Sequence, residues 1–256
     1  MSPVWQGLAQ ELALWRQAGR IATFWWRDDD AGPLEPALER LLALRASLSL
    51  PLALAAIPAV TEPELAQRLA AEDEIVVLQH GWRHRNLAGA GRRKAEFGAD
   101  RPVFERLSDV ALGRAQLLAQ FGERFLPVFV PPWNRIGDDL LPFLKNAGMV
   151  GLSRYRGRAK PSPAPGLTES NCHVDPVAWT GHRGFVGRAE AVRQMVGHLS
   201  ARRTGAADPD EPTGILSHHR QFDAACWEFV ENLLRMLRQC DEAHWLSARR
   251  MFSVAP

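Results

Sequence analysis

Cysteine is scarce in this sequence, and long runs of apolar residues are missing from it. The three cysteines, Cys172, Cys226 and Cys240, are scattered, and none belongs to a CxxC pair. This argues against a disulfide framework and a cysteine zinc site, and fits a reducing compartment. No stretch approaches the ~18 uninterrupted apolar residues of a membrane span, and residues 1–20 lack the charged leader and apolar core of a signal peptide. We therefore expect a cytoplasmic protein that binds no membrane.

An excess of charge of one sign is also missing. Lys+Arg is 31 and Asp+Glu is 29, so the formal net charge is +2. No segment concentrates basic residues, which argues against nucleic-acid binding. With 256 residues, 46% hydrophobic and 23% charged, the composition is that of an ordinary globular chain. No segment separates two chemically distinct halves, so we predict one domain over residues 1–256, with a helix in residues 1–19.

Short apolar segments alternate along the chain with segments of helical periodicity. The apolar segments predict strands at Ile21–Trp26, Leu52–Ile57, Ile75–Gln79, Leu126–Val130, Met149–Leu152 and Gly214–Ser217, with weaker ones at His173–Trp179 and near Trp245. The helical segments are Leu34–Arg45, Pro63–Ala71, Val103–Phe121, Asp138–Ala147, Ala189–Leu199 and Ala224–Arg238. Continuous apolar strands between helices indicate a parallel sheet covered by helices. About seven such units predict an α/β fold of the (β/α) barrel type, and no G-x-G-x-x-G motif follows a strand.

Three expectations concern the parts of the chain outside the strands. The helix in residues 1–19 is expected to close the bottom of the barrel. The segments Gly157–Cys172 and Arg202–Thr213 contain several prolines and glycines and predict long loops. The apolar face of the helix Val103–Phe121 is expected to consist of Phe104, Leu107, Val110, Ala111, Ala115 and Leu118.

Acidic residues follow the first predicted strand. Ile21–Trp26 leads directly into Arg27, Asp28, Asp29 and Asp30. Three adjacent carboxylates repel one another beside an apolar strand unless a cation lies there. A solvated turn or a helix N-cap is the alternative. The position matters because the active site of a parallel barrel lies at the C-terminal ends of its strands.

Two histidines, His80 and His84, follow the third predicted strand in the sequence H-G-W-R-H. The H-x-x-x-H spacing brings two imidazoles one helical turn apart, which suits chelation of one metal ion. Two unrelated loop histidines are the alternative. A site with one carboxylate, two imidazoles and open positions for water is a known catalytic arrangement. Zinc in such a site lowers the pKa of its water and polarises a carbonyl group.

Two other strand ends carry candidate groups. Pro131 and Pro132 fix a turn that can direct a peptide N–H outward as an oxyanion donor, or form only a rigid turn beside a core tryptophan. His218 follows the last main strand and is a candidate proton donor. The remaining histidines that we single out, His173, His182, His198 and His244, are interpreted as structural.

The order of these motifs resembles that of the polysaccharide deacetylases, carbohydrate esterase family 4. That family has a first motif like T-F-D-D-G, then H-S-x-x-H, R-P-P-Y, D-x-x-D-W and a late L-x-H. The corresponding segments here are R-D-D-D-A (27–31), H-G-W-R-H (80–84), V-P-P-W (130–133), D-P-V-A-W (175–179) and L-S-H (216–218). The resemblance covers about residues 20 to 220. It implies a distorted, TIM-like (β/α)7 barrel, a divalent metal ion, usually zinc (Zn2+), and hydrolysis of an N-acetyl group from a sugar.

The resemblance also implies a role for each matching residue. Asp29 corresponds to the general base and His218 to the general acid. Asp30, His80 and His84 correspond to the three metal ligands.

The resemblance extends to groups that contact the substrate. The backbone N–H of Trp133 corresponds to the oxyanion donor, and Trp179 to a wall of the substrate pocket. We expect Trp82, Trp133 and Trp179 to form an apolar wall for one face of a sugar. Arg135 is a further candidate for substrate binding.

Two positions depart from the family pattern. The arginine that steadies the base in the third motif is replaced by Val130, and Arg27 and Arg135 are alternative substitutes. The second aspartate of the fourth motif, which tunes the acid, is replaced by Ala178, and Asp175 is the candidate to serve instead.

These residues predict a metal-dependent hydrolase that removes an acyl group, such as acetyl, from an N-acylated sugar or polysaccharide. One alternative is a carbohydrate-binding or regulatory barrel with little turnover. A second is a hydrolase of non-peptide C–N bonds in a non-sugar small molecule.

Overall fold

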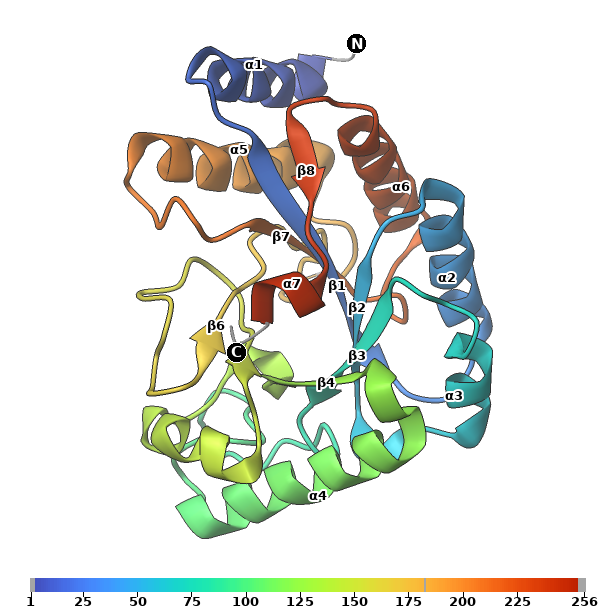
Figure 1. Cartoon of the computed structure of the whole chain (residues 1–256), viewed down its shortest axis with the longest axis vertical. Helices are drawn as coiled ribbons and strands as arrows, with labels where there is room; N and C mark the ends of the chain where they lie inside the picture. Colours follow the sequence, from blue (N-terminus) through green and yellow to red (C-terminus); the bar gives the residue numbers. More distant parts are fainter. Residues whose placement is uncertain (1–2, 182, 253–256) are drawn as a thin grey trace.

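The strands form one curled parallel sheet in the computed structural model, which describes residues 3–181 and 183–252 (Figure 1). They are β1 (Ala22–Ala31), β2 (Leu52–Ala56), β3 (Ile75–His80), β4 (Phe125–Val130), β5 (Gly151–Leu152), β6 (Thr168–Glu169), β7 (Thr213–Ser217) and β8 (Ala243–Trp245). Their order is β6-β5-β4-β3-β2-β1-β7, with β8 beside β1. Every pairing between these strands is parallel. The predicted distorted (β/α)7 barrel is therefore confirmed.

Seven α-helices lie among the described residues: α1 (Pro3–Gln17), α2 (Pro36–Leu48), α3 (Pro63–Leu69), α4 (Val103–Phe121), α5 (Arg188–Thr204), α6 (Ala224–Arg238) and α7 (Ala248–Phe252). The predicted helix at Asp138–Ala147 is a 3₁₀ helix, η4, which has Pro142 inside it. Shorter 3₁₀ turns are η1 (Pro58–Val60), η2 (Gly122–Arg124) and η3 (Pro132–Asn134). Within the described ranges, no helix has the length and apolar character needed to cross a membrane.

The weakly predicted strand His173–Trp179 is reduced to isolated bridges, one of which lies beside β7. Cys172 bridges Tyr155 on one side, and Val174 bridges Ile215 of β7 on the other. The short strand β6 was not predicted, because its two residues lie in a segment rich in proline and glycine. Pairing with β5 forms this strand, and a pairing partner is not visible in local sequence.

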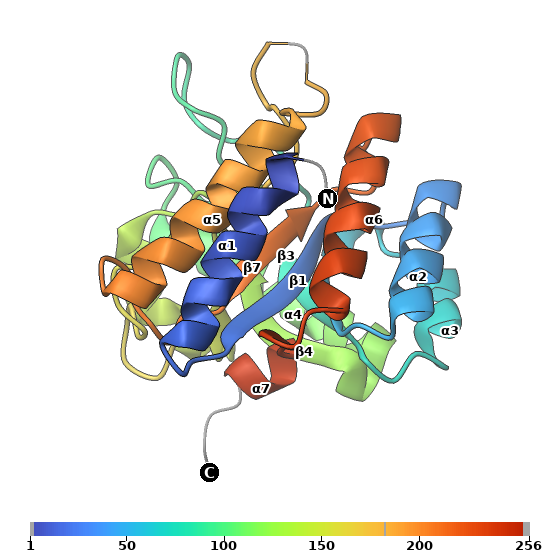
Figure 2. The same ribbon diagram turned by 90° about the horizontal axis from the view of Figure 1, so that it is seen from above.

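Helices cover the outside of the sheet, and α1 lies along α5 (Figure 2). Leu8, Leu12 and Trp15 bury one side of α1 in the outer core. The expectation that this helix closes the bottom of the barrel is wrong. A C-terminal segment, α7, packs Ala248 and Phe252 among the side chains of the barrel interior instead.

The apolar interior of the barrel is built from alternate residues of the strands. Trp25 of β1, Ala53 and Ala55 of β2, and Val76 and Leu78 of β3 share one buried cluster with Phe252. Because side chains alternate along a strand, the neighbouring residues of β1, Phe24 and Trp26, pack outward against the helices. The interior is thus a packed core that supports a site at its open end.

The expected apolar face of α4 is only partly correct: Val110 is buried and Leu107 packs against the core, but the other four residues are exposed. Phe104 is 72% exposed and Leu118 is 45% exposed, whereas the face toward the sheet contains Val110, Leu117 and Phe121. Helical periodicity identified a real apolar stripe on α4, but a second stripe of the same period is the one that packs.

Candidate metal and catalytic site

The first strand is longer than predicted, and it contains the acidic residues. β1 continues past Trp26 to Ala31, since Arg27 and Asp28 pair with β2 on one side and with β7 on the other. The prediction that the strand ends before the aspartates is therefore wrong. Polar residues remain in the strand because each finds a partner in the interior, which hydropathy alone does not show.

Two adjacent aspartates of β1, Asp29 and Asp30, both line the same cleft. Successive side chains of a regular strand point to opposite faces, but the register of β1 with β2 shifts between Asp28 and Ala31. Asp30 has a φ of 71°, in the left-handed region that non-glycine residues rarely adopt. This local turn brings the second carboxylate beside the first.

Asp30 lies between the two predicted histidines. Its Oδ1 is 3.2 Å from Nε2 of His80 and 3.3 Å from Nε2 of His84. This oxygen is buried and has no hydrogen-bond partner among the described residues. One carboxylate and two imidazoles that converge with an unsatisfied oxygen suit a divalent ion, and zinc favours this ligand set.

The two histidines are held by the backbone around them. Nδ1 of His80 donates to the carbonyl of Val130 at 3.0 Å, so in the neutral ring Nε2 carries no proton and can bind a metal ion. His84 has a φ of 53°, and Glu96 accepts its backbone N–H at 3.1 Å. Glu96 also accepts the N–H of Trp82 at 3.2 Å, so one buried carboxylate organises the loop. Sequence analysis missed Glu96, which no motif contains.

The environment gives two of the three residues, His84 and Asp30, the protonation state that a metal ion requires. Burial lowers the pKa of His80, but the charges of Asp29 and Asp30 outweigh that effect and raise it, so a metal ion has to displace a proton from this ring. Burial and the neighbouring charge of His80 lower the pKa of His84 to about 4, so its imidazole is neutral. Burial alone raises the pKa of Asp30, but the close approach of the His80 imidazole, followed by that of His218 and His84, outweighs burial and lowers the pKa below its ordinary value. A neutral imidazole and an ionised carboxylate are both competent ligands.

Asp29 is paired with Arg27, which is fully buried. Nε of Arg27 donates to Oδ1 of Asp29 at 2.8 Å, and a terminal nitrogen donates to Oδ2 at 3.0 Å. Ser153 and Asn134 accept further hydrogen bonds from the same guanidinium. Of the two substitutes left open by the sequence, Arg27 is the one that contacts Asp29. Arg135 instead donates to the carbonyl of Lys94.

His218 lies across the cleft from Asp29. Its Nε2 is 3.9 Å from Oδ2 of Asp29, and its ring packs edge-on against Trp179 with centroids 4.6 Å apart. Nδ1 of His218 is buried and has no hydrogen-bond partner in the described parts of the chain. Asp175 accepts a hydrogen bond from the indole N–H of Trp179 at 2.7 Å. Asp175 therefore fixes the tryptophan that packs against His218.

These groups surround a cleft of about 520 Å³, lined by Asp29, Asp30, His80, His84, Arg93, Trp133, Asn134, Arg135, Tyr155, Arg156, Asp175, Trp179, Thr180 and His218. All nine predicted site residues are among them. Trp133 has a φ of 55°, and its ring lies 4.4 Å from that of His84. Trp82 is not part of the lining; it packs beside the outer core near α4, so its place in the aromatic wall is wrong.

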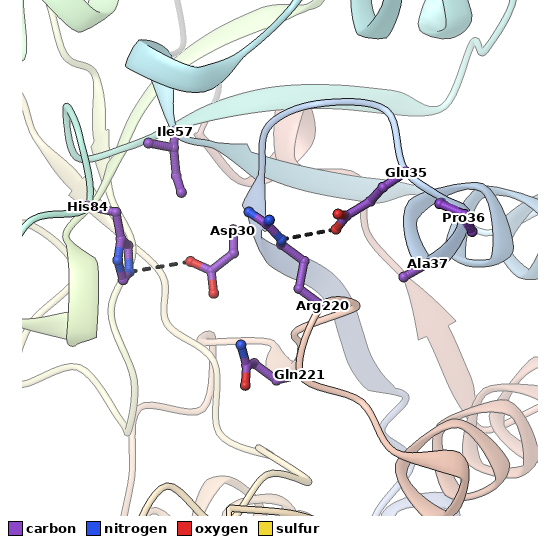
Figure 3. A pocket seen from close by; sticks show the side chains of 8 residues that line it. All are labelled: Asp30, Glu35, Pro36, Ala37, Ile57, His84, Arg220 and Gln221. Atoms are coloured by element: carbon purple, nitrogen blue, oxygen red, sulfur yellow. Dashed lines mark ion pairs between the residues drawn. The ribbon is translucent and has the colours of Figure 1, made fainter.

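A second cavity of about 670 Å³ lies next to this cleft (Figure 3). Asp30 and His84 line both cavities. Figure 3 shows Arg220 pointing toward Glu35, and the two form an ion pair at 3.0 Å. The positive charge in this second cavity is therefore balanced.

Asp28 points away from the cleft and forms a buried network that sequence analysis missed. It accepts hydrogen bonds from the hydroxyl of Ser217 at 2.6 Å and from the ring of His219. Burial alone lowers the pKa of His219, but the charge of Asp28 outweighs that effect and raises it. The pair joins β1 to the end of β7, next to His218.

A second group of possible ligands consists of His173, His198 and Glu211. The backbone N–H of Gly214 donates to Nδ1 of His173 at 3.0 Å. The proton of the neutral ring then sits on Nε2, the atom that faces Glu211, so it is not free to bind a metal ion. The geometry agrees with a structural role for His173 and His198, whereas His182 lies outside the described residues.

Comparisons with known proteins establish the fold. No family model matches the chain, and no curated protein matches it in sequence. Among solved structures, a Mycobacterium smegmatis protein described as a polysaccharide deacetylase has a TM-score of 0.58 and 15% identity, over 84% of this chain and 74% of that one. A family 4 carbohydrate esterase from Streptomyces lividans, in complex with acetate, has a TM-score of 0.56 and 15% identity, over 92% and 98%.

The same fold also occurs in a different class of enzyme. A 4-alpha-glucanotransferase from Thermococcus litoralis has a TM-score of 0.56 and 11% identity, over 93% of this chain and 41% of that one. This chain therefore has the barrel of the polysaccharide deacetylases and family 4 carbohydrate esterases, which confirms the resemblance at the level of the fold. Its function has to be argued from the site.

Proposed function

We propose that this protein is a metal-dependent deacetylase that hydrolyses the amide of an N-acylated sugar. The observation that carries the proposal is the convergence of Asp30 Oδ1 with the Nε2 atoms of His80 and His84. The neighbouring carboxylate and imidazole, Asp29 and His218, lie at the same cleft. The polysaccharide deacetylase and carbohydrate esterase names of two structures with this fold support the same reaction class.

Asp30, His80 and His84 are the residues that would hold the ion, and zinc fits the donor set best. When bound, a divalent ion supplies Lewis-acid polarisation of the scissile carbonyl and lowers the pKa of water. The further steps belong to side chains and backbone groups of this chain.

Asp29 takes the proton of the attacking water. Its two oxygens are oriented by Arg27, which holds the carboxylate in one rotamer beside Asp30. The backbone N–H of Trp133 stabilises negative charge on the carbonyl oxygen, because the η3 turn keeps this N–H without an acceptor among the described residues.

His218 donates a proton to the leaving amine. Its Nε2 is 3.9 Å from Oδ2 of Asp29, so a scissile C–N bond beside these two atoms lies within reach of both base and acid. Trp179 holds the imidazole by edge-on packing, and Asp175 holds Trp179. Trp133 and Trp179 supply the aromatic surface of the pocket for a sugar.

The Arg27–Asp29 pair favours an enzyme over a barrel that has lost turnover. A buried arginine that fixes a cleft carboxylate through two hydrogen bonds keeps the function of the arginine replaced by Val130. A binding protein needs no such oriented base.

The test is acetate release from chito-oligosaccharides by protein loaded with zinc, by protein stripped with a chelator, and by reconstituted protein. We expect release from the loaded and reconstituted forms only. If the zinc-loaded protein cleaves a non-sugar amide but no oligosaccharide, the substrate is a non-sugar small molecule and not a sugar. Zinc-loaded protein that binds oligosaccharides and cleaves none contradicts the enzyme.

A further inference from the structure

Three arginines at the cleft have no carboxylate partner among the residues that the structure describes. Arg93, Arg135 and Arg156, called here the arginine trio, line the cleft together with the metal ligands. None of the three forms an ion pair with any described residue. Two other arginines near this end of the barrel have carboxylate partners: Arg27 pairs with Asp29, and Arg220 pairs with Glu35.

The carboxylates of the cleft are engaged elsewhere. Asp29 is held by Arg27, Asp30 faces the two histidines, and Asp175 accepts from Trp179 and from the backbone of Val177. The three described aspartates of the cleft lining therefore all have partners other than the trio.

Arg135 is the half-buried member of the trio. One terminal nitrogen donates to the carbonyl of Lys94 at 2.6 Å, and Nε is buried without a hydrogen-bond partner within residues 3–181 and 183–252. Burial, and then the positive charge of Arg93, lower the pKa of Arg135. Two cations held close together without a counter-charge cost free energy in the free protein, and an anion between them recovers it.

The other two members are presented by specific backbone conformations. Arg156 has a φ of 81°, in the left-handed region. Residues other than glycine rarely adopt this conformation, and arginine has no intrinsic preference for it. Its backbone N–H donates to the carbonyl of Cys172 at 2.7 Å, which holds it in place. Arg93 lies on the loop between β3 and α4, and that loop extends beyond the helices at the same end of the view as the loop before α5 (Figure 2).

We propose that the arginine trio binds an anionic group of the N-acylated substrate: a carboxylate, a phosphate or a sulfate. The guanidinium group is always charged and presents a planar set of donors that matches these oxyanions. The metal ligands and the trio line one cleft, so the anion belongs to the same molecule as the acyl group. The part of this inference that concerns the N-acyl group rests on the proposed function. The part that concerns the anion rests only on the arginines.

The test is calorimetric binding to the zinc-loaded protein of four probes: N-acetylglucosamine, its 6-phosphate, its 6-sulfate, and N-acetylmuramic acid, which carries a carboxylate. At least one charged probe should bind about tenfold tighter than N-acetylglucosamine, as expected for one charge-assisted contact. Arg135→Gln and Arg93→Gln should each remove most of this preference. The ranking of the charged probes identifies the oxyanion.

Arg92→Gln is the matched control, because Arg92 adjoins Arg93 in sequence, pairs with Asp100 at 3.3 Å and does not line the cleft. It should keep the preference. Equal binding of all four probes overturns the inference. So does a preference that persists in Arg135→Gln and Arg93→Gln, since the zinc ion then holds the anion. If charged probes bind through the trio but no acetate is released, the proposed function is contradicted and the inference that the trio binds an anion is supported.

Discussion

Arg27 and Asp29, two residues apart on β1, form a buried ion pair in which two guanidinium nitrogens lie 2.8 and 3.0 Å from the two carboxylate oxygens. Side chains two residues apart on a strand lie on the same face, so β1 supplies both the proposed base and the group that orients it. We propose that the pattern R-x-D within one strand takes the place of the arginine that the related motif has at the position of Val130, the last residue of β4.

Replacement of Arg27 by lysine should lower turnover while the metal ion stays bound. Lysine keeps the charge but cannot hold both oxygens of Asp29, and misplacement of a reacting group costs on the order of 10²-fold in rate. The measurements are kcat for acetate release and zinc content. Arg45→Lys is the control, since Arg45 makes a similar pair with Glu72 at 2.8 Å away from the cleft. Full turnover in Arg27→Lys contradicts this role.

Asp29→Asn should retain zinc and lose roughly 10²–10⁴-fold in turnover, the usual contribution of a general base. The amide keeps the shape of the side chain but cannot take a proton. Zinc content and kcat are measured on the same preparation. Loss of zinc in Asp29→Asn assigns ligation to Asp29 and contradicts the division of roles between Asp29 and Asp30.

His218→Ala should abolish cleavage of an amide and spare an activated aryl ester, whose leaving group needs no proton. Parallel assays with one acyl group on both leaving groups measure this difference. An equal loss on the two substrates rules out His218 as the acid.

His219→Ala should act on stability instead of on leaving-group dependence. The substitution leaves Asp28 buried without its imidazole partner, and breaking a buried pair costs about 3–5 kcal/mol. Urea unfolding measures the loss. If His219→Ala keeps wild-type stability and selectively loses amide cleavage, His219 is the acid and His218 is not.

The stacked histidines His173 and His198 should make the protein less stable as the pH falls below 6.5. Burial, and then Arg202, lower the pKa of His173 to about 3; burial, and then His173, lower the pKa of His198 to about 2. Between these values and the ordinary 6.5, the unfolded chain binds more protons than the folded one, so the free energy of unfolding decreases with decreasing pH.

Each histidine contributes up to about 1.4 kcal/mol per pH unit in that window. Urea unfolding at a series of pH values from 7 to 4 measures the slope. His198→Gln should make it shallower by that contribution, and an unchanged slope contradicts the assignment.

The sequence predicted the arrangement of the barrel because most of its strands are short apolar runs, and each run is followed by polar residues. The four motifs that follow these strands lie at the same end of the barrel because the main strands are parallel. The alternation of strands and helices along the sequence predicts this parallel arrangement. The sequence left open which arginine contacts Asp29, because that choice depends on the face on which each side chain lies. It missed Glu96, whose three backbone partners form only after the loop folds.

The left-handed conformation of Asp30 was also invisible in the sequence. A triplet of aspartates permits several assignments of base and ligand, and the choice depends on a shift in register that the pairing of β1 with β2 imposes. The exposed stripe of α4 shows the same limit, since two apolar stripes of equal period differ only in what packs against them.

Zinc stoichiometry tests the central claim most directly. After zinc loading and dialysis, elemental analysis should find one equivalent in the wild-type protein and none in His80→Ala or His84→Ala, while His198→Gln, from the second histidine cluster, keeps one equivalent. A full equivalent in His80→Ala and His84→Ala, or its loss in His198→Gln alone, contradicts the site built on Asp30, His80 and His84.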